Sequence, residues 1–214
     1  MGRGKFITFE GGEGSGKSTQ CPRLAERLTE AGIAVTLTRE PGGTAGANAI
    51  RALLVEGEAS RWDPRTEALL HFAARRDHVT KVIEPALAGG GWVVCDRFTD
   101  SSVAYQGYGH ELGAAYIDAL AELTIGNFIP DLTLILDIDP EAGLKRAGQR
   151  GGGEARYEGM GIDFHRRLRA GFHEIAKAEP GRCTIIDAAG SEEEVAEAIW
   201  AAVQNTMGAG NVLG

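Results

Sequence analysis

The sequence has few cysteines, and they lie far apart. Only three occur among 214 residues, at positions 21, 95 and 183. An odd number at wide spacing argues against a disulfide framework and against a metal site built from closely spaced cysteine pairs. We therefore expect reduced thiols, which are typical of a cytoplasmic protein.

Long apolar runs and an excess of basic residues are missing as well. The apolar run near the start is only as long as a strand, so we expect neither a signal peptide nor a membrane span. Acidic residues outnumber basic ones by 30 to 22, which gives a net charge of −8. This balance argues against nucleic acid or a membrane surface as a partner. If the ligand is an anion, arginines must be concentrated around it, so the position of each arginine is informative.

Glycine, by contrast, is abundant, and one glycine-rich run carries a recognisable pattern. Residues 11–18 read GGEGSGKS, which fits the phosphate-loop sequence of Gly, four residues, Gly, Lys and Ser or Thr. An apolar segment precedes it and a helical pattern follows it, as a phosphate loop requires. The plainer alternative is a glycine-rich turn from strand to helix, but the full pattern with these flanks favours a nucleoside triphosphate site.

The chemistry of such a loop assigns roles to its residues. Backbone N–H groups surround a phosphate, and the N-terminus of the following helix adds its positive dipole. Lys17 is expected to reach the terminal phosphates and the hydroxyl of Ser18 to hold Mg²⁺. The predicted ATP-binding residues of the loop are Gly11, Gly12, Glu13, Gly14, Ser15, Gly16, Lys17, Ser18 and Thr19.

Short apolar runs alternate with amphipathic patterns along the rest of the chain. This alternation predicts an α/β fold, with a five-stranded, mainly parallel sheet flanked by helices. The strands are expected at residues 5–10, 33–38, 92–95, 132–136 and 183–187. Helices are expected at residues 16–31, 45–54, 64–88, 113–123, from 139 onward, at 162–178, and after Ser191.

Irregular segments are expected at three places. Residues 96–112 read as a loop after the third strand, and Pro22 predicts a local distortion of the first helix. Residues 149–161 combine a run of three consecutive glycines with embedded arginines and suggest a short lid, while residues 207–214 suggest a frayed tail. No linker is long enough to divide the chain, so we predict a single domain spanning residues 1–214.

Four motifs together resemble those of thymidylate kinases and occur in the same order. They are the loop at 11–18, TREPGGT at 38–44, LHFAARR at 70–76 and DRF at 96–98. The second motif is much more specific than the phosphate loop alone, and the resemblance covers roughly residues 5–200. It implies a dimeric P-loop NTPase fold that transfers the γ-phosphoryl group of ATP, with Mg²⁺, to dTMP.

The resemblance also implies which residues hold the acceptor. Glu13 would lie near its sugar, Arg39 near both phosphates, and Arg97 on the acceptor phosphate, with Arg51 as a further phosphate contact. Phe72 would stack on thymine with Arg76 beside it, and Tyr105 would disfavour a ribose 2′-hydroxyl. Polar contacts to the base would come from Ser102 and Gln106. On the donor side, Asp96 would lie close to the metal and Arg146 against adenine.

The phosphate loop contains no arginine, which separates this chain from one subtype of the family. The other subtype has its catalytic arginine in the lid, where this chain has Arg150 and Arg156. The aspartate usual before the second lid arginine is Ala155 here, so the choice between the two stays open. The predicted catalytic residues are Glu13, Lys17, Asp96, Arg97, Arg150 and Arg156, with Ser18 and Asp96 at the metal.

Several alternatives remain from the sequence. The chain could be another nucleotide kinase, a nucleotide-dependent switch or a degenerate kinase that serves as a scaffold. Phe72 could belong to the core, and Arg97 could form a structural ion pair with Asp96 or Glu40. If the chain forms a homodimer, as the resemblance implies, the apolar faces of residues 69–82 and 114–123 are candidate interfaces.

Overall fold

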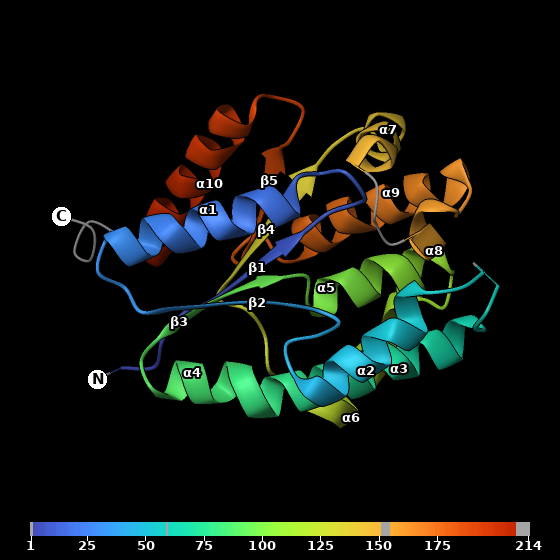
Figure 1. The fold of residues 1–214 in the computed structure, drawn as a ribbon, viewed down its shortest axis with the longest axis horizontal. Helices are drawn as coiled ribbons and strands as arrows, with labels where there is room; N and C mark the ends of the chain where they lie inside the picture. Colours follow the sequence, from blue (N-terminus) through green and yellow to red (C-terminus); the bar gives the residue numbers. More distant parts are fainter. Residues whose placement is uncertain (1, 59, 151–154, 209–214) are drawn as a thin grey trace.

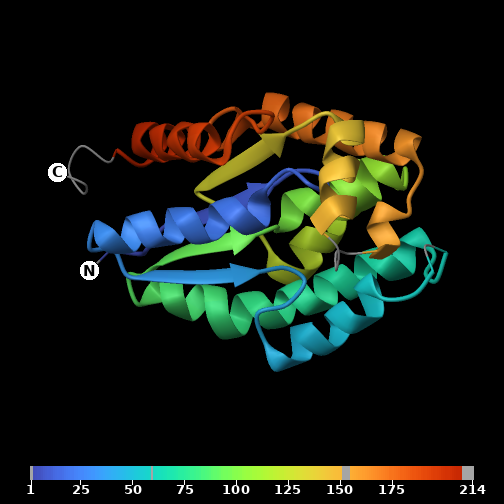
Figure 2. The same cartoon turned by 45° about the horizontal axis from the view of Figure 1, so that its top comes forward.

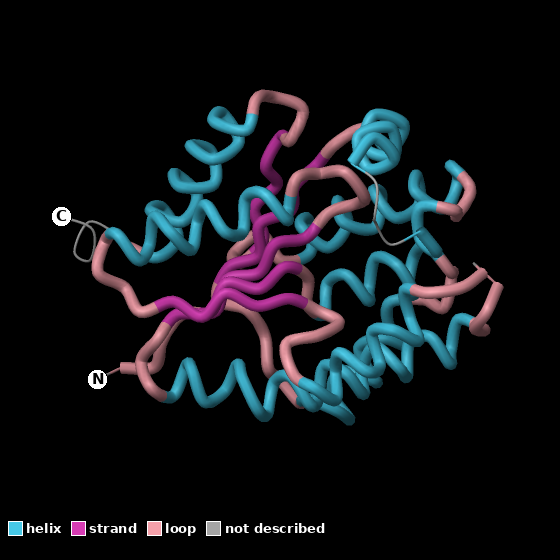
Figure 3. The backbone as a smooth tube through the Cα atoms, viewed as in Figure 1, coloured by secondary structure: helices cyan, strands magenta, loops and turns pink. Residues whose placement is uncertain are grey.

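The computed structural model describes residues 2–58, 60–150 and 155–208, with only the backbone of Arg150 and Ala155. A single sheet forms its centre, with helices on both sides (Figure 3). The strands are β1 (Phe6–Glu10), β2 (Val35–Arg39), β3 (Trp92–Asp96), β4 (Leu132–Asp137) and β5 (Cys183–Asp187). Their order is β2-β3-β1-β4-β5, and every pair is parallel. This confirms the predicted fold class.

The helices connect the strands as crossovers. They are α1 (Lys17–Glu30), α2 (Ala45–Val55), α3 (Pro64–His78), α4 (Glu84–Ala88), α5 (Thr99–Ser102), α6 (Ala114–Ile125), α7 (Pro140–Arg150), α8 (Ala155–Glu158), α9 (Ile162–Ala178) and α10 (Glu192–Met207). Two π-helical segments, η1 (Val79–Ile83) and η2 (Val103–Gly109), extend α3 and α5.

Two helical layers cover the sheet, one on each face (Figure 1). On one face α1 and α10 pack against β1, β3 and β4 through a cluster that includes Leu24, Leu28 and Ile199. On the other face η1 and α4 cover one end, and η2 and α9 cover the other. β1 lies between two parallel neighbours and both layers, which explains why all five of its residues are buried.

Local sequence signals account for several element ends. Ser191 and Glu194 form a capping box at the start of α10, which begins directly after Ser191 as expected. Thr44 caps α2 by accepting a hydrogen bond from the N–H of Ala47, and Asp63 caps α3 just before Pro64. α1 is one continuous helix through Pro22, so the proline does not divide it.

The prediction of a loop at residues 96–112 is wrong, because most of this stretch is helical in α5 and η2. Its glycines serve close packing rather than turns. A Cβ atom at Gly109 would lie 2.6 Å from the ring of Phe164 in α9. The helix predicted at 64–88 is not α-helical throughout, because the π-helical segment η1 lies between α3 and α4.

The segment predicted as an irregular lid, residues 149–161, is helical at both ends. α7 continues to Arg150 and α8 begins at Ala155. Residues 151–154, and residues 209–214 of the predicted tail, lie outside the described residues. Among the described helices, none has both the length and the apolar character needed to cross a membrane.

Candidate active site at the carboxyl ends of the strands

The phosphate loop joins β1 to α1 at the sheet edge where the parallel strands end (Figure 2). Gly14 has a φ of 68°, and a Cβ there would lie 2.0 Å from the carbonyl oxygen of Gly143 in α7. The loop therefore needs glycine both for its turn and for its contact with α7. Gly16 precedes α1 without a side-chain cap, which leaves the first N–H groups of the helix available to an anion.

Lys17 lies along this loop and is almost fully buried. Its Nζ donates hydrogen bonds to the carbonyl oxygens of Gly11, at 2.9 Å, and Gly12, at 2.8 Å, and to Oγ of Ser15 at 3.1 Å. Burial, followed by repulsion from Arg97, lowers the pKa of Lys17 to about 8. A phosphate placed here would favour the charged ammonium.

A cavity of about 500 Å³ opens in front of the phosphate loop. Its basic lining comes from Lys17, Arg39, Arg51 and Arg97. Its acidic lining comes from Glu13, Glu40, Asp96 and Glu158. In a protein of net charge −8, a lining whose basic side chains match its acidic ones is less negative than the molecule as a whole, which suits an anionic ligand.

Asp96 and Ser18 line the same cavity and fit the predicted magnesium site. Asp96 ends β3, and its Oδ1 is buried without a hydrogen-bond donor in the described part of the chain. Glu158 of α8, which the sequence did not indicate, is a further carboxylate in the lining. No cluster of three or more metal-ligating side chains occurs among the described residues. This agrees with Mg²⁺, which is held by few protein ligands together with phosphates and water.

Arg97 follows β3 in an unusual backbone conformation. Its φ is 72°, a left-handed value that is uncommon for a residue other than glycine. Glu10 supports this turn, because its buried carboxyl group accepts hydrogen bonds from the N–H of Phe98 and the hydroxyl of Ser101. The Arg97 guanidinium donates to the carbonyl oxygen of Gly11 at 3.0 Å and lies over the ring of Tyr105.

Glu13 projects from the phosphate loop into a ring of polar groups. The hydroxyl of Tyr105 donates to its Oε1, Nη2 of Arg97 lies 3.6 Å from the same oxygen, and Nδ1 of His165 lies 3.2 Å from Oε2. Burial alone would raise the pKa of Glu13, but His165, Arg97 and Tyr105 lower it to about 2. Glu13 is therefore a carboxylate at neutral pH.

A narrow second pocket adjoins the first. Its lining consists of Glu40, Pro41, His71, Arg75, Arg97, Ser101, Ser102, Tyr105, Gln106 and Tyr157. Glu40 and Arg97 line both cavities, so two ligands bound in them would meet at these side chains.

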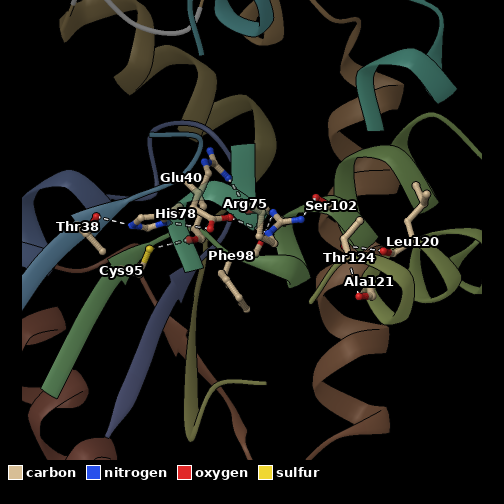
Figure 4. Close-up of polar contacts among 12 residues, drawn as sticks. Thr38, Glu40, Arg75, His78, Cys95, Phe98, Ser102, Leu120, Ala121 and Thr124 are labelled. Atoms are coloured by element: carbon tan, nitrogen blue, oxygen red, sulfur yellow. Dashed lines mark hydrogen bonds and ion pairs between the residues drawn. The ribbon is translucent and has the colours of Figure 1, made fainter. Parts of the chain in front are cut away.

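A hydrogen-bond network fixes one wall of this pocket (Figure 4). Arg75 donates to Glu40 at 2.7 Å, to the hydroxyl of Ser102 at 3.0 Å, and to the carbonyl oxygen of Phe98 at 2.9 Å. His78 links the other oxygen of Glu40, at 3.0 Å, to the hydroxyl of Thr38. Both carboxylate oxygens of Glu40 thus have hydrogen-bond partners, and these bonds hold the wall in place.

The structure corrects the predicted wall residues on α3. Phe72 is 1% exposed within the core, where the Arg75 guanidinium covers its ring at 4.6 Å. Arg76 is exposed and lines neither cavity. His71 and Arg75 line the pocket instead. Both pairs have the spacing i, i+4, so the sequence pattern could not decide between the two helix faces.

Of the two predicted lid arginines, Arg150 and Arg156, the structure describes the side chain of Arg156 alone. The guanidinium of Arg156 pairs with the fully buried Glu67 and donates to the carbonyl oxygens of Leu54, at 3.2 Å, and Glu58, at 3.3 Å. Arg156 lies against α2 and α3 and does not line the phosphate cavity. The side chain of Arg150 lies outside the described residues.

The remaining predicted residues divide between the two cavities and the surface. Thr19 lies in the first turn of α1, and its N–H donates to the carbonyl oxygen of Gly16. Arg146 is exposed on α7, where its guanidinium donates to the carbonyl oxygens of Ala188 and Ala189. Arg39, Arg51, Ser102, Tyr105 and Gln106, the predicted acceptor contacts, each line one of the two cavities.

The fold and the site define a class of protein. A phosphate loop, a neighbouring acidic residue and two adjoining cavities on one sheet edge are the parts of a P-loop phosphotransferase. Residues 9–199 match the sequence model of the thymidylate kinase family. The chain belongs to the thymidylate kinase family.

Similar proteins support this assignment over nearly the whole chain. A thymidylate kinase of Caulobacter vibrioides is 56% identical over 208 residues, which cover 97% of this chain and 100% of that protein. One from a Bradyrhizobium species is 50% identical, covering 96% and 92%. The crystal structure of thymidylate kinase from Ehrlichia chaffeensis has a TM-score of 0.79 and 38% identity, covering 94% and 100%.

Proposed function

We propose that the two adjoining cavities bind the two substrates of a dTMP kinase. The chain transfers the γ-phosphoryl group of ATP to dTMP, giving dTDP and ADP in the synthesis of dTTP. The observation that carries the proposal is Arg97, which lines both cavities and lies beside the phosphate loop. A guanidinium in this position can bind the acceptor phosphate while ATP occupies the loop.

Phosphoryl transfer requires positioning and charge neutralisation more than covalent chemistry. Lys17, the loop N–H groups and the dipole of α1 would hold the phosphates of ATP. Ser18 and Asp96 would hold Mg²⁺, which neutralises charge on the donor phosphates when it is bound. Arg39 and Arg51 add positive charge at the same cavity.

The second pocket suits a thymine base. Gln106 donates through Nε2 to Glu67 at 2.7 Å, while its Oε1 is buried without a donor in the described structure. An acceptor in this position complements the N3–H of thymine and would oppose cytosine, which has no hydrogen on N3. Ser102 and Arg75 lie on the same lining, and Tyr105 lies between the base pocket and Glu13.

The test is a coupled assay of ADP formation with a panel of monophosphates. We expect Mg²⁺-dependent turnover that rises sharply with dTMP, a lower rate with dUMP, and little with dCMP, AMP or GMP. Lys17→Met should lower kcat by about 10²–10³-fold, because one charge contact to the transferred group is lost. Equal rates across the panel would contradict the proposed acceptor.

We further propose that the chain is a cytoplasmic homodimer. Cys21, Cys95 and Cys183 are all buried and free, as expected where thiols stay reduced. Leu69 of α3 is 54% exposed and Leu123 of α6 is 82% exposed, and the two helices contact each other. Large apolar side chains exposed on neighbouring helices suit a second copy of the chain.

A further inference from the structure

The side-chain amide of Gln106 has its two ends in different surroundings. Its Nε2 donates a hydrogen bond to Oε1 of Glu67 at 2.7 Å, whereas its Oε1 is buried without a donor in the described structure. Gln106 lines the second pocket, and Glu67 lies outside that lining. The acceptor end of the amide is therefore the end that a base bound in the pocket can meet.

Glu67 of α3 determines this orientation, because it can only accept a hydrogen bond from the amide. Its side chain is fully buried, and its Oε2 forms an ion pair with the Arg156 guanidinium. Burial alone would raise the pKa of Glu67, but its polar neighbours, with His110 first among them, lower it to about 2. A carboxylate has no proton to donate, so an amide beside it must present its nitrogen.

We propose that Glu67 is a positioning residue that makes the second pocket select thymine or uracil over cytosine. It fixes Gln106 with Oε1 toward the base. An acceptor there suits the N3–H of thymine and uracil and opposes cytosine, whose N3 is itself an acceptor. Glu67 acts through Gln106 and touches neither substrate. This inference rests on the proposed function, in which the second pocket holds the base of the acceptor nucleotide.

Glu67→Gln tests the proposal, because it exchanges one carboxylate oxygen for an amide nitrogen at nearly constant shape. Arg156 has only donors, so the oxygen of the new amide should face its guanidinium and the nitrogen should face Gln106. Gln106 should then turn its oxygen toward position 67 and its nitrogen toward the base. Calorimetry should show that the affinity for dUMP falls relative to that for dCMP by about tenfold or more, since a donor now meets N3–H.

The choice of nucleotides supplies a control for distortion of the pocket. dTMP and dUMP present the same hydrogen-bonding edge and differ by one methyl group, so the ratio of their affinities should not change in Glu67→Gln. General loosening of the pocket would instead weaken the binding of dTMP, dUMP and dCMP alike. Glu26→Gln, the same exchange at an exposed position of α1, should alter none of the three affinities.

A double-mutant cycle tests whether Glu67 acts through Gln106. In a Gln106→Leu background, Glu67→Gln should no longer alter the ratio of dUMP to dCMP affinity. An unchanged ratio in Glu67→Gln alone, or the same change in both backgrounds, would overturn the inference. So would equal affinities of the wild-type protein for dUMP and dCMP, a measurement that needs no variant. A wild-type protein that prefers dTMP to dCMP but forms no dTMP-dependent ADP would contradict the proposed function alone.

Discussion

At the scale of single residues, Glu10 shows how a buried acid supports the site. It ends β1 with no exposed surface, and it holds the turn that carries Arg97 through Phe98 and Ser101. Burial, followed by repulsion from Asp100, raises the pKa of Glu10 from 4.5 to about 8. Hydrogen bonds to the carboxyl group and the charge of Arg97 oppose this rise.

The raised pKa predicts a pH dependence of stability. The folded protein keeps the proton of Glu10 above pH 4.5, where the unfolded chain releases it, so this stabilisation is complete below 4.5 and is lost as pH rises through about 8. In Glu10→Gln the Tm should therefore change less between pH 5 and 8 than in the wild type. Scanning calorimetry across this range checks it, and parallel Tm curves for the two proteins would contradict it.

Glu13 and Glu67 have lowered pKa values and so give the opposite pH dependence of stability. Burial would raise the pKa of each, but their polar partners lower both to about 2. Their stabilisation is present above pH 4.5 and is lost as the pH falls through about 2. These two residues therefore contribute to the acid limb of the stability curve, which should remain in Glu10→Gln.

At the scale of elements, the sequence predicted the strands and most helices from apolar alternation. It failed at η2, because Gly107 and Gly109 read as turn residues, whereas both are helical and Gly109 allows the close approach of Phe164 in α9. The sequence also predicted the wrong face of α3 for the base pocket. It indicated Phe72 and Arg76, whereas His71 and Arg75 line the pocket. Both errors involve tertiary contacts, which a pattern along one chain cannot contain.

The residues of the candidate site also fall into those that the sequence could predict and those that it could not. Residues in motifs with fixed spacing, such as Lys17, Ser18 and Asp96, could be placed from the sequence because their roles depend on local backbone geometry. His165 and Tyr157 come from segments far along the chain, and only the fold brings them to the site. No spacing in the sequence signals either residue.

α8 gives a prediction that distinguishes the two lid arginines. Arg156 joins this short helix to Glu67 of α3, and both side chains are fully buried. Arg156→Ala should cost about 3–5 kcal/mol of folding free energy, because it removes one partner of a buried ion pair with Glu67. Urea unfolding measures this loss.

The matched change is Arg150→Ala, since we propose Arg150 as the lid arginine that reaches the γ-phosphate. It should lower kcat by about 10²–10³-fold while changing the stability and the KM for dTMP little. A stable Arg156→Ala protein with a strongly reduced kcat would exchange the two roles. An unchanged kcat in both variants would exclude a catalytic arginine in this segment.

At the scale of the whole molecule, the charge distribution explains how an acidic protein can bind two anionic nucleotides. Arg39, Arg51 and Arg97 join Lys17 around one cavity, whereas other arginines are paired with carboxylates on the outer surface. Arg23 and Arg27, for example, pair with glutamates of α10. Around this cavity basic side chains match the acidic ones, so the excess negative charge of the protein lies elsewhere on the molecule.

The proposed dimer is the last property that belongs to the whole molecule. We expect light scattering at micromolar concentration to give twice the mass of one chain, 22.6 kDa. Leu123→Glu should shift the protein toward monomer, because a buried, unpaired carboxylate at an interface is costly. Ile185→Glu is the matched control, since Ile185 is 40% exposed on the edge strand β5 and belongs to neither α3 nor α6. A wild-type monomer, or dissociation by the control change as well, would rule out an interface formed by α3 and α6.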